Sequence, residues 1–391
     1  YKDLDPVAHQ ELLPQRLNES SGTYNIKEET THLYAEVVLE ESFYDMPWLL
    51  DLGVRYIKTD ITSSGWSQNP ANVKFNDDGT LANEDWKKTE LQHFKGSYTE
   101  ILPSLNFKIS LTDEVVFRLG LSQTLSRPTL DWLRPNTSIS PELDEDQMGG
   151  GDDRAQRSMY ENDPALAPFF ADQLDTAIEW YYSDSGNLAF ATFYKDLGNF
   201  IDTRETVEQI DGQPFTVGRS YNDTSQHAII RGYELAWSQS FDEFLPENLA
   251  GFGIWANYSY NNSESGKYDD EGEQLPFYGL SKNQYNVSVY YEQHGFSANV
   301  SYNYRDAFQT RDFWYWSNDI GDYAIDQEME TDWEALSVSL SYEVNDNLSL
   351  TFDGNNLLDP DHYRYLGSNQ SAIVSAANFG KRYSVGVRYK F

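Results

Sequence analysis

The last ten residues constrain the fold more than any other stretch of the chain. From Arg382 to Phe391 the side chains alternate between two chemical classes, as they do on the two faces of an extended strand. A soluble sheet produces this pattern when the apolar face lies in a core, and a membrane barrel produces it when that face meets lipid. The final aromatic is less usual in a soluble sheet, because a free C-terminus tends to fray into water. The apolar face consists of Tyr383, Val385, Val387, Tyr389 and Phe391.

The composition predicts an all-β protein and excludes several other classes. No run approaches the roughly twenty apolar residues of a membrane helix, whereas aromatic residues reach 15% of the chain and favour strands. The 391 residues include no cysteine, so disulfides and thiolate metal sites are excluded. With 63 acidic and 28 basic residues the net charge is −35, which repels nucleic acid. The first residues lack the pattern of a signal peptide, so we expect any such peptide to lie upstream or to have been removed.

Apolar and polar residues alternate in about thirteen segments, and short and long connections between them alternate strictly. The long connections cover about 62–91, 126–170, 203–226, 261–279, 306–331 and the stretch before the closing strand. The predicted strands are 29–40, 50–57, 98–111, 115–125, 174–182, 188–202, 229–239, 252–260, 285–291, 296–304, 336–344, 348–357 and 382–391.

This asymmetry predicts a transmembrane antiparallel β-barrel. Outer-membrane barrels have short periplasmic turns and long extracellular loops, whereas a sandwich or propeller has no reason to separate them. The chemistry of the two strand faces supports the same prediction, because the apolar side of strands such as 296–304 and 336–344 carries no charge. The opposite side holds serine, asparagine, arginine and glutamate, which suit a wet or plugged lumen better than a dry core.

An odd strand count is informative in its own right. Both ends of a bacterial barrel normally lie in the periplasm, which requires an even number of strands. The sequence therefore predicts that residues 1–391 are the C-terminal part of a larger barrel, unless the count is wrong by one. The closing strand should pair on one side with 348–357, and its other edge should be open or paired with another polypeptide.

Several short stretches, in this order, resemble the C-terminal barrel of TonB-dependent outer-membrane receptors, particularly a proteobacterial group. The segment Asn162-Asp163-Pro164-Ala165-Leu166-Ala167-Pro168 is similar to the family's NPxLxP element, with Asp163 as a departure or insertion. The other matching stretches are Leu52-Gly53-Val54-Arg55-Tyr56, Ile101-Leu102-Pro103-Ser104-Leu105-Asn106, Leu125-Ser126-Arg127-Pro128, Glu179-Trp180-Tyr181-Tyr182, Phe193-Tyr194-Lys195-Asp196, Asn355-Asn356-Leu357-Leu358-Asp359 and Tyr389-Lys390-Phe391.

The resemblance implies a barrel of about twenty-two strands with a plugged lumen. It also implies an N-terminal plug domain and TonB box, neither of which is visible in this sequence. Transport would draw on the proton motive force through the TonB-ExbB-ExbD complex. The residues Tyr383, Val385, Val387, Tyr389 and Phe391 would then form the signal that the barrel-assembly machinery recognises.

Two long connections hold the candidate ligand-binding residues. In 306–331, Phe313, Trp314, Tyr315 and Trp316 have no predicted strand partner, and aromatic faces stack on sugars or catechol-like ligands. The alternatives are a girdle at the lipid interface and packing within the loop. In 126–170, Trp132 and Arg134 precede an acidic, glycine-rich stretch, 142–153. That stretch offers carboxylates for Ca²⁺, although a flexible, solvated loop without a cofactor explains it better, because its spacing matches no EF-hand.

No arrangement of residues supports an enzyme. There is no GxSxG motif, the six histidines lack the spacing of a zinc site, and the glycines 149–151 precede no Lys-Ser or Lys-Thr pair. The sequence therefore predicts no catalytic or metal site.

The predicted function is TonB-dependent uptake of a nutrient. Acidic loops rich in aromatic residues favour a neutral oligosaccharide, while Arg134, Arg154, Arg157 and Arg311 keep a ferric siderophore as the alternative. A passive porin and a soluble glycan-binding β-sandwich are alternatives of other classes. The acidic loops also suggest lipopolysaccharide as a partner through bridging divalent cations, which chelation would disrupt.

Overall fold

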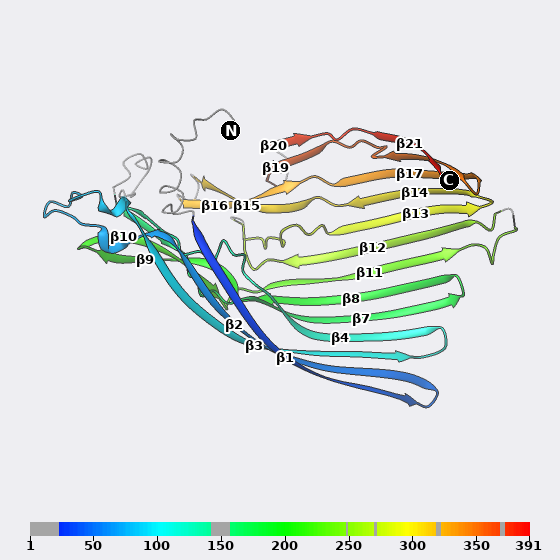
Figure 1. Ribbon diagram of the computed structural model, residues 1–391, viewed down its shortest axis with the longest axis horizontal. Helices are drawn as coiled ribbons and strands as arrows, with labels where there is room; N and C mark the ends of the chain where they lie inside the picture. Colours follow the sequence, from blue (N-terminus) through cyan, green and yellow to red (C-terminus); the bar gives the residue numbers. More distant parts are fainter. Residues whose placement is uncertain (1–22, 142–156, 248, 270–271, 318–321, 368–371) are drawn as a thin grey trace.

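The computed structural model describes residues 23–141, 157–247, 249–269, 272–317, 322–367 and 372–391. They form one antiparallel sheet of thirteen strands, which we call the main sheet, and two four-stranded sheets (Figure 1). The main sheet consists of β1 (Tyr24–Phe43), β2 (Met46–Gln68), β3 (Thr89–Ser110), β4 (Val115–Ser126), β7 (Phe169–Ser183), β8 (Gly186–Gly198), β11 (Ala228–Ser240), β12 (Phe252–Glu264), β13 (Asn283–Gln293), β14 (Phe296–Arg305), β17 (Trp333–Asn345), β18 (Leu348–Asn355) and β21 (Arg382–Tyr389).

The predicted count of thirteen strands is confirmed, and so is the alternation of short and long connections. The short turns lie at one end of the strands and the long connections at the other (Figure 1). In the turn between β13 and β14, His294 and Gly295 have φ values of 56° and 74°. A two-residue turn with positive φ at both positions matches the twist of the two strands that it joins.

The sequence underestimated the length of β2 and β3. Their predicted ends leave 62–91 as a polar connection, but β2 continues to Gln68 and β3 begins at Thr89. In this part of β2, Thr59, Ile61 and Ser63 are buried on one face. Ile61 and Ser63 contact Leu133, which belongs to the connection after β4. Because Thr59 and Ser63 are polar although buried, this part of β2 lacks the alternation of apolar and polar residues from which a strand is predicted.

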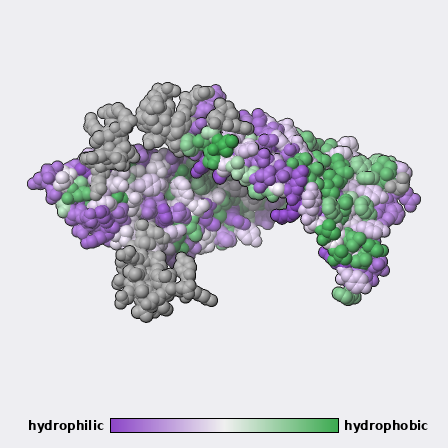
Figure 2. Space-filling model, turned by 90° about the horizontal axis from the view of Figure 1, so that it is seen from above, coloured by the Kyte–Doolittle hydropathy of each residue, from purple (hydrophilic) through white to green (hydrophobic). Residues whose placement is uncertain are grey.

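The pairing register keeps one apolar face continuous across the main sheet. One row runs through Val37, Leu52, Leu105, Leu121 and Leu174, each the direct partner of the next. Many large apolar side chains of this face remain exposed. Seen from above, hydrophobic residues gather mainly on the right-hand part of the molecule (Figure 2). We call the face of the main sheet that carries the row from Val37 to Leu174 the apolar face, and the opposite one the polar face.

Four long connections were predicted as loops, and that prediction is wrong because each of them contributes two strands. The connections after β4 and β8 contribute β5 (Thr137–Ser140), β6 (Arg157–Glu161), β9 (Phe200–Ile210) and β10 (Gln213–Asp223), which pair as a sheet in the order β5-β6-β10-β9. We call it the cap sheet. The 306–331 connection and the one before β21 contribute β15 (Phe308–Ser317), β16 (Asp322–Glu330), β19 (His362–Leu366) and β20 (Ala372–Ala377). We call this second group, ordered β15-β16-β19-β20, the ionic sheet.

Helical structure is confined to two short 3₁₀ turns in the described residues. They are η1 (Pro70–Asn72) and η2 (Asp85–Lys87), and both belong to the connection between β2 and β3. No helix in the described part of the chain is long and apolar enough to cross a membrane.

A segment after β4 folds onto the polar face of β2 and β3. Leu133 and Leu166 are fully buried against Ile61, and the hydroxyl of Ser63 donates a 2.7 Å hydrogen bond to the carbonyl of Leu133. Leu166 belongs to the motif 162–168. A Cβ at position 96 on β3 would lie 2.9 Å from the Cβ of Ala165, so glycine there permits the close approach.

The closing strand pairs as expected. β21 pairs with β18 over eight residues, from Asn355 opposite Arg382 to Leu348 opposite Tyr389. Within the described residues, β1 and β21 are the two ends of the main sheet and do not pair with each other. The expectation that one edge of β21 is open or available to another polypeptide is therefore confirmed, while a closed barrel of twenty-two strands stays a prediction.

Candidate ligand-binding site

The predicted site residues Trp132 and Arg134 flank the buried Leu133 beside β2. Trp132 is 40% exposed, and Arg134 forms an ion pair with Asp131 at 3.4 Å. Arg134 Nε is buried and has no hydrogen-bond partner. These residues belong to the segment that covers the polar face of β2, so the packing of Leu133 alone accounts for their placement.

The aromatic run Phe313, Trp314, Tyr315 and Trp316 lies on β15, and the prediction that it has no strand partner is wrong. These residues pair with 323–326 of β16, with Trp314 opposite Ile325. Phe313 is half-buried, whereas the side chains of the other three lie outside the described part of the structure. The acidic stretch 142–153 also lies outside the described residues, so Ca²⁺ binding there stays a prediction.

Of the other arginines considered from the sequence, Arg157 is structural. Its guanidinium donates to the carbonyl oxygens of Pro141 and Gly79 and lies 4.8 Å from the centroid of the Phe75 ring. Arg154 lies outside the described residues. Arg311 lies on β15 in the ionic sheet and forms an ion pair with Glu328 on β16.

A cavity of about 400 Å³ lies between the main sheet and the ionic sheet, at the end of the strands that carries the long connections. The main sheet contributes Arg305 at the end of β14 and Trp333 at the start of β17, which are direct partners in the ladder. The remaining lining residues are Glu330, His362, Tyr363, Arg364, Ser375, Ala377 and Phe379. A basic and aromatic wall is therefore assembled from segments more than seventy residues apart.

Arg305 is held by both charge and packing. Its Nη2 donates a 2.6 Å hydrogen bond to Glu330 Oε1, and its guanidinium lies 4.6 Å from the centroid of the Phe308 ring. Its Nε is buried without a hydrogen-bond partner. A buried donor without a partner costs free energy unless water or a ligand accepts from it.

Arg364, which lines the cavity, is positioned by the carboxylate of Glu328. Arg364 Nη1 donates to Glu328 Oε1 at 3.2 Å, and Arg364 Nε donates to Ser375 Oγ at 3.0 Å. Glu328 is only 1% exposed and also accepts from Arg311, whose Nη2 lies 2.6 Å from Glu328 Oε2. Arg364 itself remains 48% exposed. The buried carboxylate therefore fixes the guanidinium and leaves part of it open to a ligand.

The surroundings of Glu328 favour its ionised form. Burial alone raises the pKa of this carboxyl, but the hydrogen bond and charge of Arg311 outweigh burial, with the Thr310 hydroxyl and Arg364 acting in the same direction. The net effect is a pKa below the ordinary value of 4.5.

The chemistry of the cavity suits an anionic ligand with flat groups. Two guanidinium groups line it against one carboxylate, Glu330, which Arg305 already neutralises. Guanidinium groups bind carboxylates and other oxyanions through paired N–H donors, and aromatic faces stack on rings. Trp333 and Phe379 supply such faces, with Phe379 5.2 Å from the His362 ring. Nowhere in the described residues do three or more His, Asp or Glu side chains gather as a metal site.

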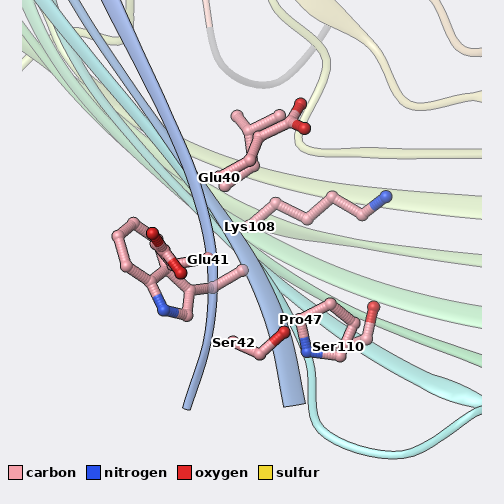
Figure 3. A pocket seen from close by; sticks show the side chains of 8 residues that line it. Glu40, Glu41, Ser42, Pro47, Lys108 and Ser110 are labelled. Atoms are coloured by element: carbon pink, nitrogen blue, oxygen red, sulfur yellow. The ribbon is translucent and has the colours of Figure 1, made fainter. Parts of the chain in front are cut away.

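A second cavity, of about 560 Å³, lies beside the short turns. Glu40 and Lys108 extend to the same side of the sheet there, and Glu41 lies on the other side (Figure 3). Trp48 is the aromatic residue of its lining, and the other lining groups come from neighbouring positions of three strands. The 400 Å³ cavity is therefore the stronger candidate, since it combines aromatic and basic groups from distant segments.

The sequence did not identify Arg305, Trp333, His362, Arg364 and Phe379. Each lies at a strand end or within a connection that was treated as a loop. One signal was present, because Arg305 and Trp333 border the long connection 306–332 at its two ends. Charged and aromatic residues at strand ends beside long loops are candidates for a binding site at the mouth of a barrel.

Comparisons with known proteins agree with this architecture. A family model described as TonB dependent receptor-like, beta-barrel, matches residues 4–357. None of the curated proteins compared with the chain matches it significantly.

Several solved structures share the fold. A variant of the ferric enterobactin receptor PfeA from Pseudomonas aeruginosa is 14% identical, with a TM-score of 0.56 over 94% of this chain and 54% of that one. The siderophore receptor PiuA from Acinetobacter baumannii is 15% identical, with a TM-score of 0.56 over 94% and 44%. The ferric-catecholate import receptor Fiu from E. coli is 14% identical, with a TM-score of 0.59 over 94% and 45%. The chain spans about half the length of these proteins, and such identities show the fold alone.

Proposed function

Because the chain belongs to the family of TonB-dependent receptor β-barrels, an outer-membrane family, we propose that it forms part of a receptor that takes up a ferric siderophore. The observation that carries the ligand class is the cavity of Arg305, Arg364, Trp333 and Phe379. In a chain with a net charge of −35, an anionic chelate needs a local basic site to overcome the general repulsion. The structurally similar PfeA, PiuA and Fiu carry siderophore or catecholate receptor names, which supports the same choice.

The receptor would be a transporter and not an enzyme, with its long connections outside the cell. Its proposed energy source is the TonB-ExbB-ExbD complex, which would act through a plug domain and a TonB box preceding these residues. Its proposed assembly partner is the barrel-assembly machinery, which would bind the C-terminal residues Tyr383, Val385, Val387, Tyr389 and Phe391. Lipopolysaccharide would surround the apolar face.

A neutral oligosaccharide, which the sequence favoured, is less well supported by the cavity. Hydroxyl-rich ligands need no cationic partner, and the Trp314 and Trp316 side chains that motivated this choice lie outside the described residues. Binding data on both ligand classes decide between them.

The test is a binding titration of the full receptor in detergent with ferric enterobactin and with maltoheptaose. We expect Arg364→Gln to weaken binding of ferric enterobactin by about 10- to 100-fold, because a charge-assisted hydrogen bond contributes about 1.5–3 kcal/mol. The matched control is Arg204→Gln, an arginine of the cap sheet that lies 4.3 Å from the Tyr221 ring. Tight maltoheptaose binding without chelate binding would overturn the ligand class.

A further inference from the structure

On β13, β14 and β17, the polar face of the main sheet carries mainly uncharged side chains between the cavity and the short turns. On β14, the residues that follow Arg305 on this face, towards the short turn, are Asn303, Ser301 and Asn299. Their neighbours are Ser337 and Ser339 on β17 and Ser288 on β13, in direct register. We call these six residues the uncharged track.

The track begins at the cavity. Arg305 and Trp333 form the pair directly above Asn303 and Ala335, and both line the cavity. Six residues of an antiparallel strand rise about 20 Å, so the track descends about that far from Arg305 to Asn299. Three carboxylates border the track. Asp353 lies on the neighbouring strand β18, opposite Ser339, and Glu292 and Glu343 lie near the short-turn ends of β13 and β17.

The polar face of β4, β7 and β11 differs in its charge. Arg118 donates two hydrogen bonds to Glu179, at 2.8 and 3.2 Å, and Asp175 and Glu234 line a depression beside them. An anion that moved along this wall would meet carboxylates that repel it, a guanidinium that is already paired and Lys108, which lines the same depression. The track and the polar face of β4, β7 and β11 therefore present different charges to an anionic solute.

One hydrogen bond of the track joins two neutral side chains, and another leads from the track to a bordering carboxylate. Ser288 Oγ donates to Asn299 Oδ1 at 3.0 Å, while Ser339 Oγ donates to the bordering Asp353 at 2.8 Å. Hydroxyl and amide groups exchange such bonds with a passing solute at little net cost, because each site binds weakly. Passage requires sites that are favourable enough to enter and weak enough to leave.

We propose that the uncharged track is the path along which the captured anionic chelate leaves the cavity and moves down the inner wall. This inference rests on the proposed function of the cavity. It assigns the exit path to β13, β14 and β17 and excludes the wall of β4, β7 and β11.

The test uses the absence of cysteine from these 391 residues, and any cysteine in the preceding region of the receptor is first replaced by alanine. Single cysteines are introduced in the full receptor in outer membranes at Ser301→Cys on the track, Ser122→Cys on the charged wall and Val300→Cys on the apolar face. The probe is the anionic, membrane-impermeant thiol reagent methanethiosulfonate ethylsulfonate. We expect Ser301→Cys to react at least tenfold faster than Ser122→Cys and Val300→Cys not to react. Equal or faster reaction at Ser122→Cys would overturn the path.

A second measurement separates the path from the cavity. After labelling of Ser301→Cys with biotin maleimide, we expect binding of ferric enterobactin to stay within twofold and its uptake into cells to fall at least tenfold. Unchanged uptake by the labelled protein would refute the path. If no variant binds the chelate, the proposed ligand class is wrong. The labelling rates of Ser301→Cys and Ser122→Cys then still show whether the track is more accessible to an anion than the charged wall of β4.

Discussion

The cap sheet and the ionic sheet are similar in size but are held together differently. The cap sheet encloses a core of Val73, Ile139, Met159, Phe215 and Val217, none of which is more than 5% exposed. In the ionic sheet the fully buried side chains are polar, with Glu328 1% exposed and Gln309 0% exposed. Apolar burial is non-directional and independent of pH, whereas a buried carboxylate depends on its partners.

Ion pairs also connect the ionic sheet to its surroundings. Asp312 on β15 accepts from Lys267 at 2.9 Å and from Gln309 at 3.0 Å, and Lys267 belongs to the connection after β12. Hydrogen bonding to Asp312 and Tyr278 raises the pKa of Lys267, although burial opposes that shift as the largest single influence. The cap sheet is therefore held by apolar burial, while the ionic sheet, which lines the cavity, is held by ion pairs and hydrogen bonds that can be exchanged.

The largest effect on the difference between the two sheets is expected from emptying the core of the cap sheet. Phe215→Ala removes a fully buried ring from β10 and should cost about 3–5 kcal/mol of stability. We expect amide hydrogen exchange in β9 and β10 to accelerate accordingly, while exchange in β16 and β19 stays unchanged. Hydrogen exchange of the detergent-solubilised protein measures both.

The matched control for Phe215→Ala is Val207→Ala. Val207 lies on β9 of the same sheet but is 73% exposed, so its truncation should change stability by less than about 0.5 kcal/mol. Equal acceleration in the two variants would mean that the core does not hold the cap sheet together.

The corresponding change in the ionic sheet is Glu328→Gln, for which we expect a smaller effect. The variant removes the charge that holds Arg311 and Arg364, and hydrogen bonds to charged groups contribute about 1.5–3 kcal/mol. The two guanidinium groups are 64% and 48% exposed, so they can rehydrate and limit the loss. Faster amide exchange confined to β15, β16 and β19 would be the expected result.

Glu208→Gln in the cap sheet is the control for that substitution. Glu208 also forms an ion pair with an arginine, Arg219, but its side chain is 39% exposed. Exposed pairs contribute about 0–1 kcal/mol. If Glu208→Gln costs as much as Glu328→Gln, burial is not what distinguishes the two sheets.

The sequence predicted the main sheet well because each strand there obeys one rule. Over most of their length these strands alternate between apolar and polar residues, as in Arg382 to Phe391, and every strand of the main sheet was located, although the extensions of β2 and β3 were missed. The cap and ionic sheets obey no such rule. Phe215 and Val217 alternate with polar residues, but their partners Val73, Ile139 and Met159 lie far away in the sequence and do not form a pattern with them.

The candidate site was missed for the same reason. Arg364 and Glu328 are thirty-six residues apart and meet only because β19 pairs with β16. The sequence highlighted Trp314 and Trp316, which are conspicuous together, whereas the cavity takes Trp333 and Phe379 singly from different segments. Aromatic clusters are visible in a sequence, but a site assembled across a long-range strand pairing is not.

The smallest expected effect is a difference in pH dependence between the two sheets. The folded-state pKa of Glu328 lies below its ordinary value of 4.5, so the ionised form stabilises the fold above that value, and this contribution is lost as pH falls through the folded-state pKa. The Arg219 hydrogen bond also lowers the pKa of Glu208, but its greater exposure weakens the linkage. We expect acidification from pH 6 to pH 3 to reduce amide protection in β16 and β19 more than in β9 and β10, after correction for intrinsic exchange rates. Glu328→Gln should abolish that difference, and its persistence in the variant would assign the pH dependence to another group.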